Sequence, residues 1–318
     1  MEHTTAALFG PADWTRNVGK ETSSTSIGIG ALKRGERIIT TVYPSKYPEK
    51  IWSLLFPMYL SGSVFLNVRK IDRELGETII ALDLLGMKKG RIHVGELVDT
   101  SLLKNIVKGT VVETYTPFDP EPAALREELF ELPIVDNSGN TNVVVDQAFN
   151  VKGVGCVVLG FVTSGIVEKH QELFTKPGGN RTVVRSIQLH DKDHERASAG
   201  SRVGLALKNI EPEDLPRGCS LSPASSRIET MEKARMRFRI SKLWKDDISG
   251  GDRFHLSNTL QFSPVRLENV RSRKDADIPA LEADAVLEGR MWHMPGDRFG
   301  LAFLDSKTFR VIGSGEII

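Results

Sequence analysis

Residues 145–165 read VDQAFNVKGVGCVVLGFVTSG and begin the stretch, ending at Ser222, that decides the fold. Short apolar runs, such as residues 156–162 and 203–207, alternate in it with glycine-containing turns. The runs are partly β-branched and are bounded by turn residues at regular intervals, which is typical of strands in a small antiparallel barrel rather than of helices. The sequence therefore predicts a β-barrel over residues 139–224.

Four motifs of this stretch resemble the second domain of the translational GTPases. They are FNVKGVGCVVLGFVTSG from residue 149, VRSIQLHD from 184, AGSRVGLALKNI from 199 and LPRGCSLS from 215. The likeness is closest to archaeal elongation factor Tu and its selenocysteine-specific relative, SelB. This resemblance implies a three-domain protein, with an α/β GTPase-like domain over residues 1–138 and a second β-barrel over residues 225–318.

Composition sets broad limits on function. The chain has 318 residues, enough for two or three domains. Its 42 basic residues nearly cancel 41 acidic ones, so it lacks the overall positive field of many nucleic-acid binders, although a local basic patch stays possible. The sequence has no long apolar run and no signal-peptide pattern at its N-terminus, so we expect a cytoplasmic protein without membrane contact. Cys156 and Cys219 are expected to be buried free thiols.

Alternating strand-like and helix-like segments before residue 132 predict a βα-layered domain with a mainly parallel sheet. Strands are expected at residues 6–9, 38–43, 63–68, 91–94 and 110–115, and helices at 48–60, 73–87, 100–108 and 122–132. Gly86 is a plausible C-cap for the second helix. The polar loop at residues 136–140 marks the first domain boundary.

After the linker SPASSRIETMEK, the final part again reads as strands. Arg235, Arg237 and Arg239 alternate with apolar residues, which predicts a strand with one basic face. The terminal RVIGSGEII resembles the closing strand of the third domain in the same family.

The resemblance implies a nucleotide site in the first domain, and its motifs can be tested one by one. The nearest match to GxxxxGK[ST] is the run from Trp14 to Glu21, in which Gly19 and Lys20 match. Trp14 stands where a glycine must allow close backbone approach, and Glu21 stands where a hydroxyl should hold the metal. We therefore expect a site that has lost its nucleotide.

The other two GTPase motifs point the same way. Asp83 to Gly86 fits DxxG but lies inside a predicted helix, and the expected DxxG turn reads YPSKYP at residues 43–48. The guanine-reading NKxD is replaced by Glu96-Leu97-Val98-Asp99, in which Asp99 alone matches. The chain best resembles archaeal SelB-like proteins with a degenerate GTPase domain, which implies no GTP, no cofactor and no catalytic residues.

The same resemblance places a pocket for the terminal adenosine of tRNA on the barrel. Carried over by position, Gln188 and Asp191 would lie beside the adenine and Arg202 near the ribose or phosphate, although the family usually has Asn at the position of Arg202. The glycines at 153 and 155 fit a tight turn.

Two further groups of residues could bind a ligand but can also be explained as ordinary surface or loop residues. A basic loop carries Arg266, Arg271, Arg273 and Lys274, and either a solvated surface or an RNA phosphate contact would explain it. His190 and His194 have metal-ligand spacing but flank a strand-to-loop region, so no metal is expected.

The sequence thus predicts a monomeric, non-enzymatic translation-factor-like protein that binds RNA, either tRNA or the ribosome. One alternative is a module that binds a translation factor or regulator protein without RNA. The other is a divergent but active GTPase.

Overall fold

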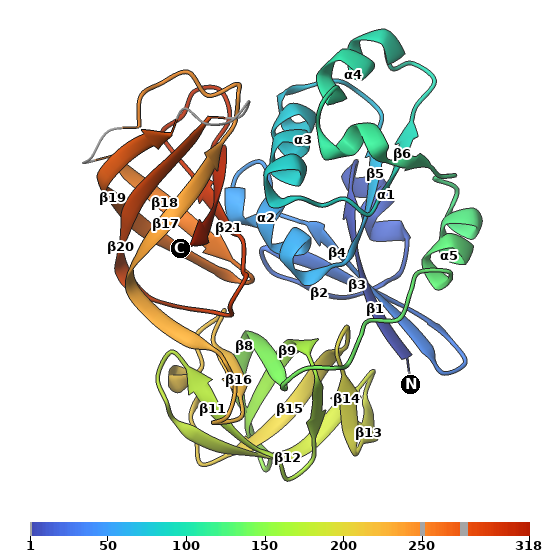
Figure 1. Cartoon of the computed structure of the whole chain (residues 1–318). Coiled ribbons are helices and arrows are strands. Elements are labelled where there is room, and N and C mark those ends of the chain that lie inside the picture. Colours follow the sequence, from blue (N-terminus) through green and yellow to red (C-terminus); the bar gives the residue numbers. More distant parts are fainter. Residues whose placement is uncertain (1, 249–251, 274–278) are drawn as a thin grey trace.

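The computed structural model describes residues 2–248, 252–273 and 279–318 of the chain. It has an α/β domain followed by two closed β-barrels, which confirms the predicted fold class (Figure 1). Among the described residues, none of the helices has the length and apolar character needed to cross a bilayer.

The first domain is built on a seven-stranded sheet in the order β2-β3-β4-β1-β5-β6-β7. The strands are β1 (Glu2–Phe9), β2 (Lys20–Ser24), β3 (Ile27–Arg34), β4 (Arg37–Pro44), β5 (Ser63–Val68), β6 (Gly90–Val94) and β7 (Thr116–Pro117). Strands β4, β1, β5, β6 and β7 are parallel, and β3 and β2 add an antiparallel edge. All of β1 after its first residue is buried, as expected for a central strand covered on both faces.

Helices cover the two faces of this sheet. They are α1 (Ala12–Asn17), α2 (Ile51–Leu60), α3 (Arg73–Leu85), α4 (Thr100–Val107) and α5 (Pro122–Phe130). The Asp72 carboxylate caps α3 by accepting the Leu75 N–H at 2.9 Å. Gly86 ends α3 with φ of 69°, a left-handed conformation that glycine adopts without steric cost, so the predicted C-cap is confirmed.

One local expectation was wrong, and one hairpin had no prediction. Residues 110–115 form the 3₁₀ helix η1 (Val111–Thr114) instead of a strand, because the Val111 N–H donates to the Asp83 carboxylate at 2.9 Å and Tyr115 bonds back to Val112. The β2–β3 hairpin was not anticipated. Its glycine Gly28 lies under the Tyr43 ring, where an added Cβ would come within 2.1 Å of a ring carbon.

The second domain is a six-stranded barrel in the order β11-β16-β8-β9-β15-β12, closed by the pairing of β11 with β12. Its strands are β8 (Asn142–Val151), β9 (Gly155–Ser164), β11 (Glu172–Lys176), β12 (Arg181–Leu189), β15 (Arg202–Lys208) and β16 (Ser220–Ser222). Short strands β10 (Ile166–Glu168), β13 (Lys192–His194) and β14 (Arg196–Ser198) and the 3₁₀ helix η2 (Pro212–Asp214) complete it. Cys156 and Cys219 are buried and unpaired in its core, as expected.

The third domain is a closed barrel in the order β17-β20-β19-β18-β21-β22. Its strands are β17 (Glu229–Ile240), β18 (Arg253–Asn258), β19 (Gln261–Arg273), β20 (Ala280–His293), β21 (Phe299–Ala302) and β22 (Val311–Ile317). The predicted domain boundaries at 138/139 and 224/225 fall between α5 and β8 and between β16 and β17.

Candidate functional site

A cavity of about 520 Å³ lies at the carboxyl ends of the parallel strands β1, β4 and β5. This edge is where open α/β sheets usually bind their ligands. Apolar and proline side chains dominate its lining, with Phe9, Pro11, Tyr43, Pro44, Tyr47 and Pro48 among them. Two of its basic groups already have carboxylate partners: Arg69 pairs with Asp13 at 2.9 Å, and Lys70 with Asp72 at 2.7 Å.

The turn that follows β1 offers few donors to an anion. A phosphate loop needs several successive backbone N–H groups that point at the ligand. Pro11, at the start of this turn, has no N–H. The N–H groups of Trp14 and Thr15 donate to the Pro11 carbonyl at 3.1 and 3.0 Å, because α1 begins at once.

The segment identified from the sequence as the phosphate-loop remnant lies partly elsewhere. Trp14 is a core residue of α1, whose indole N–H donates to the Pro120 carbonyl at 3.0 Å. Gly19 precedes the edge strand β2, and Lys20 and Glu21 pair there with β3. Sequence reasoning missed that Gly10, directly after the apolar end of β1, is the residue that topology places at the start of the turn.

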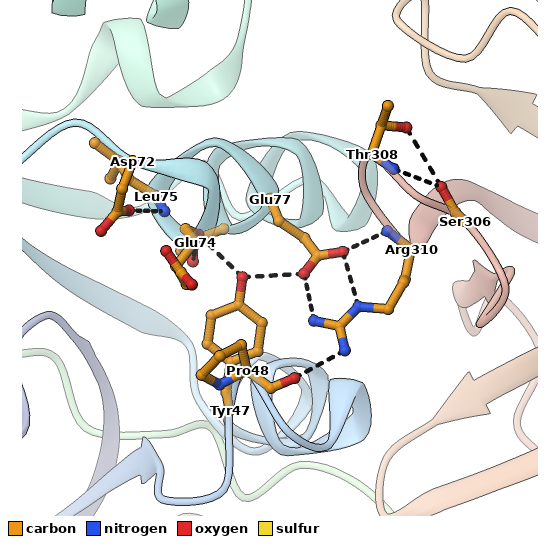
Figure 2. Close-up of polar contacts among 10 residues, drawn as sticks. Tyr47, Pro48, Asp72, Glu74, Leu75, Glu77, Ser306, Thr308 and Arg310 are labelled. Atoms are coloured by element: carbon orange, nitrogen blue, oxygen red, sulfur yellow. Dashed lines mark hydrogen bonds and ion pairs between the residues drawn. The ribbon is translucent and has the colours of Figure 1, made fainter.

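The turn after β4, where DxxG was expected, is linked to the third domain. The Tyr47 hydroxyl donates to the Glu77 carboxylate at 3.0 Å, and the Pro48 carbonyl accepts from Arg310 at 2.8 Å (Figure 2). The Arg310 guanidinium pairs with Glu77 at 2.7 Å, and the Arg310 backbone N–H also donates to that carboxylate. The Glu77 side chain is 1% exposed, so this ion pair is buried between α3 and the third barrel. Burial and the nearby Glu77 charge raise the pKa of Tyr47 far above its ordinary value, so its hydroxyl stays a donor.

The remaining GTPase-motif residues have structural partners. Asp99 is the N-cap of α4, and its carboxylate accepts the N–H groups of Ser101 and Leu102 at 2.9 and 3.0 Å. Asp83 lies in α3 and pairs with Arg239 of the third domain.

On the second barrel, the three residues expected to hold a terminal adenosine have separate contacts. Gln188 donates to Asp193 at 3.0 Å across the β12–β13 hairpin, and Asp191 lies in the turn of that hairpin with φ of 61°. The Arg202 side chain is 13% exposed and pairs with Asp146 at 3.1 Å. Arg217 pairs with the same carboxylate at 2.9 Å and its guanidinium lies 5.3 Å from the centroid of the Phe56 ring in the first domain.

This placement changes the interpretation of Arg202. Burial lowers the pKa of Arg202 and of Arg217, while the shared Asp146 charge opposes that shift. Both guanidinium groups pair with the one buried carboxylate, and Arg217 also contacts Ser26 and Phe56 of the first domain. Asp146 was not expected from the sequence to be the partner of Arg202.

In the third domain, where strands were expected, the basic loop belongs largely to strand β19. Arg266 and Arg271 are exposed on it, Arg273 ends it, and Lys274 lies outside the described residues. The basic face of β17 is neutralised: Arg235 pairs with Asp284 at 3.2 Å and Arg237 with Glu282 at 3.3 Å. Such paired charges attract a phosphate backbone weakly.

Sequence reasoning also missed a histidine cluster between the first and second domains. His3 of β1 lies within electrostatic reach of His190 and His194 of the β12–β13 hairpin. It is 2% exposed, and its pKa falls to about 4, chiefly because burial disfavours the charged ring. The spacing of His190 and His194 was visible in the sequence, but their contact with a strand almost 190 residues away was not.

Comparisons with known proteins agree with this architecture. The family model of elongation factor Tu domain 2 matches residues 155–222. The uncharacterized protein MJ0325 of Methanocaldococcus jannaschii is 31% identical over 320 residues, with the whole length of both chains aligned. The selenocysteine-specific elongation factor of the same organism is 31% identical over 188 residues, which are 55% of this chain and 40% of that protein.

A solved structure shows the same fold over the full chain. Translation elongation factor SelB from Methanococcus maripaludis, in complex with the GTP analogue GppNHp, superposes with a TM-score of 0.82 at 21% identity, covering 100% of this chain and 79% of that one. With the full-length match to the M. jannaschii protein, this fold and the domain 2 motifs leave one assignment: the chain belongs to the elongation factor Tu/SelB-like family of archaeal proteins.

Proposed function

We propose that this protein is a cytoplasmic translation-factor-like protein that does not bind GTP, has no catalytic activity, and binds RNA through its barrels. The observation that carries the first part is the turn after β1. There Pro11 lacks an N–H, and the N–H groups of Trp14 and Thr15 are already bonded to its carbonyl.

The turn after β4 supports the same proposal. In nucleotide-driven switches, a loop changes its contacts when the γ-phosphate leaves. Here Tyr47 and Pro48 contact Glu77 and Arg310, both protein groups, so the turn has partners without any nucleotide. The first domain then acts as a scaffold that holds the barrels in place.

RNA binding is proposed because one relative is a selenocysteine-specific elongation factor and because Lys33, Lys192 and Arg196 lie together at the junction of the first two domains.

Titration with a fluorescent GTP analogue in the presence of Mg²⁺ tests the loss of nucleotide binding. We expect no saturable signal in the micromolar range, whereas SelB from Methanococcus maripaludis, whose structure holds the GTP analogue GppNHp, provides a positive control. Saturable micromolar binding would refute this part of the proposal and favour a divergent GTPase.

Filter binding with aminoacylated and deacylated tRNA over a salt series tests the RNA part. We expect binding that weakens with salt, because each neutralised phosphate releases counterions. If neither tRNA nor ribosomes bind in a salt-dependent way, the protein-binding alternative takes the place of the RNA proposal.

A further inference from the structure

A cavity of about 600 Å³ lies between the first and second domains, away from the crevice at the carboxyl edge of the sheet. His3 of β1, Lys33 of β3 and Asn137 of the interdomain linker line it on one side. Residues of the β12–β13 hairpin and β14 line the other side: Leu189, Lys192, His194, Glu195, Arg196 and Ala197. In Figure 1 the N-terminal end of β1 lies beside the tip of the second barrel that carries β13 and β14.

The cavity wall holds buried polar atoms whose hydrogen bonds are unmade. Both ring nitrogens of His3, Nε2 of His194 and Oδ1 of Asn137 are buried without a partner in the described part of the chain. His3 itself is 2% exposed. A buried ring N–H without a partner is costly, so the unpaired imidazole groups on this wall point to a ligand that accepts hydrogen bonds from them.

The charges around the cavity favour an anion. Lys33, Lys192 and Arg196 line it, and none of the three has an ion-pair partner among the contacts found within residues 2–248, 252–273 and 279–318. Of the two lining carboxylates, Glu195 pairs with Lys169 at 3.1 Å, and Glu36 also has an interaction partner. The cations therefore exceed the carboxylates that are open to a ligand.

A metal ion fits this wall less well. Among the described residues, no three His, Cys, Asp or Glu side chains are arranged to hold a metal. Imidazole and lysine side chains instead donate N–H groups, and a phosphate accepts several of them at once.

We propose that this interdomain cavity is a phosphate-binding site, with Lys33, Lys192 and Arg196 supplying charge and His3 and His194 supplying ring N–H donors. The phosphate belongs either to the backbone of a bound RNA, which deepens and rests on the function proposed above, or to a small free anion. Both sources present the same tetrahedral group to the same residues.

Calorimetric titration with inorganic phosphate, at ionic strength matched with chloride, tests the site without any RNA. We expect saturable binding and a shift of the His3 and His194 ring signals in nitrogen-edited NMR spectra. Lys192→Gln should weaken phosphate binding roughly tenfold, because a charged donor is lost. Lys104→Gln, on exposed α4 at the far side of the first domain, makes the same charge change and should leave binding unaltered.

Filter binding of tRNA to the same two variants identifies the source of the phosphate. If the phosphate comes from RNA, Lys192→Gln lowers the salt slope by about 1 while Lys104→Gln does not. If phosphate binds but the two variants hold RNA equally well, the ligand is a free anion and the site stands, whether or not the RNA proposal does.

The same measurements can also refute the phosphate site separately from the RNA proposal. When neither phosphate binding nor the RNA salt slope responds to Lys192→Gln, the site is refuted, even if the protein binds RNA by another surface. His194→Gln provides a second variant that retains a polar side chain on the hairpin, so the result does not depend on one substitution folding well.

Discussion

The buried pair between Glu77 and Arg310 should dominate the attachment of the third barrel to the first domain. Glu77→Gln retains the shape of the side chain and removes its charge. The Arg310 guanidinium, whose side chain is 16% exposed, then loses its only carboxylate in the described contacts and keeps the Pro48 carbonyl.

The magnitude follows from the burial of the pair. Breaking a buried ion pair from one side costs about 3–5 kcal/mol, because the other charge stays buried without compensation. In the Glu77→Gln variant, the Tyr47 hydroxyl can still donate to the amide oxygen. We therefore place the destabilisation at about 3 kcal/mol, the lower end of that range. Removing both charges, in Glu77→Gln with Arg310→Met, should restore about 2 kcal/mol of it.

Urea unfolding of the two single variants and the double variant measures this coupling. Hydrogen exchange should show faster exchange at the α3 amides and around Arg310 in each single variant. The exposed pair Lys233–Glu268, with both side chains about half exposed, is a matched control whose coupling should stay below about 1 kcal/mol. A Glu77–Arg310 coupling as small as that of the control pair would refute the reasoning.

Three further predictions concern single residues. The pKa of His3 is about 4 in the folded chain and about 6.5 in the unfolded chain, so its contribution to stability is complete above pH 6.5 and is lost as the pH falls toward 4. At pH 5 the loss should be about 2 kcal/mol. His3→Gln should remove this pH dependence, which urea unfolding at pH 7.5 and 5 would measure. Trp14→Ala should lower the free energy of unfolding by about 3–5 kcal/mol, and Trp14→Phe should lower it less, because the ring is buried and the indole N–H donates to the Pro120 carbonyl. Thermal unfolding of both variants measures this, and equal losses would contradict the prediction. Asp146→Asn should destabilise more than Arg202→Met in the same assay, since it leaves two guanidinium groups, with side chains 13% and 28% exposed, without their anion. The reverse order would show that Asp146 is not the centre of that cluster.

Segments whose pattern is local were predictable from the sequence. Helix α3 has its apolar face, the Asp72 cap and the Gly86 stop within one stretch, and it was placed within two residues. Residues 110–115 carry a β-branched run, but a contact with Asp83, far back in the chain, turns them into a 3₁₀ helix. Local propensity could not reveal that contact.

In the candidate site, too, local features could be predicted from the sequence and contacts between distant segments could not. The strand that carries Gln188 was expected from its motif, but its pairing with β13 was not. The pairing of Arg202 with Asp146 depends on how β9 brings β15 and β8 together in the barrel. The cavity that His3 lines is formed by residues of two domains, so the spacing of residues within one segment could not predict it.

The contacts that link Tyr47 and Pro48 to Glu77 and Arg310 bear on how the protein would be regulated. Because this turn is held by groups of the same polypeptide, it has its contacts with the third barrel without a nucleotide. If the chain does not bind GTP, as proposed above, nucleotide hydrolysis cannot release the barrel at this place. Cells would then regulate the protein through its abundance and through competition for its partner, and not through the ratio of GTP to GDP.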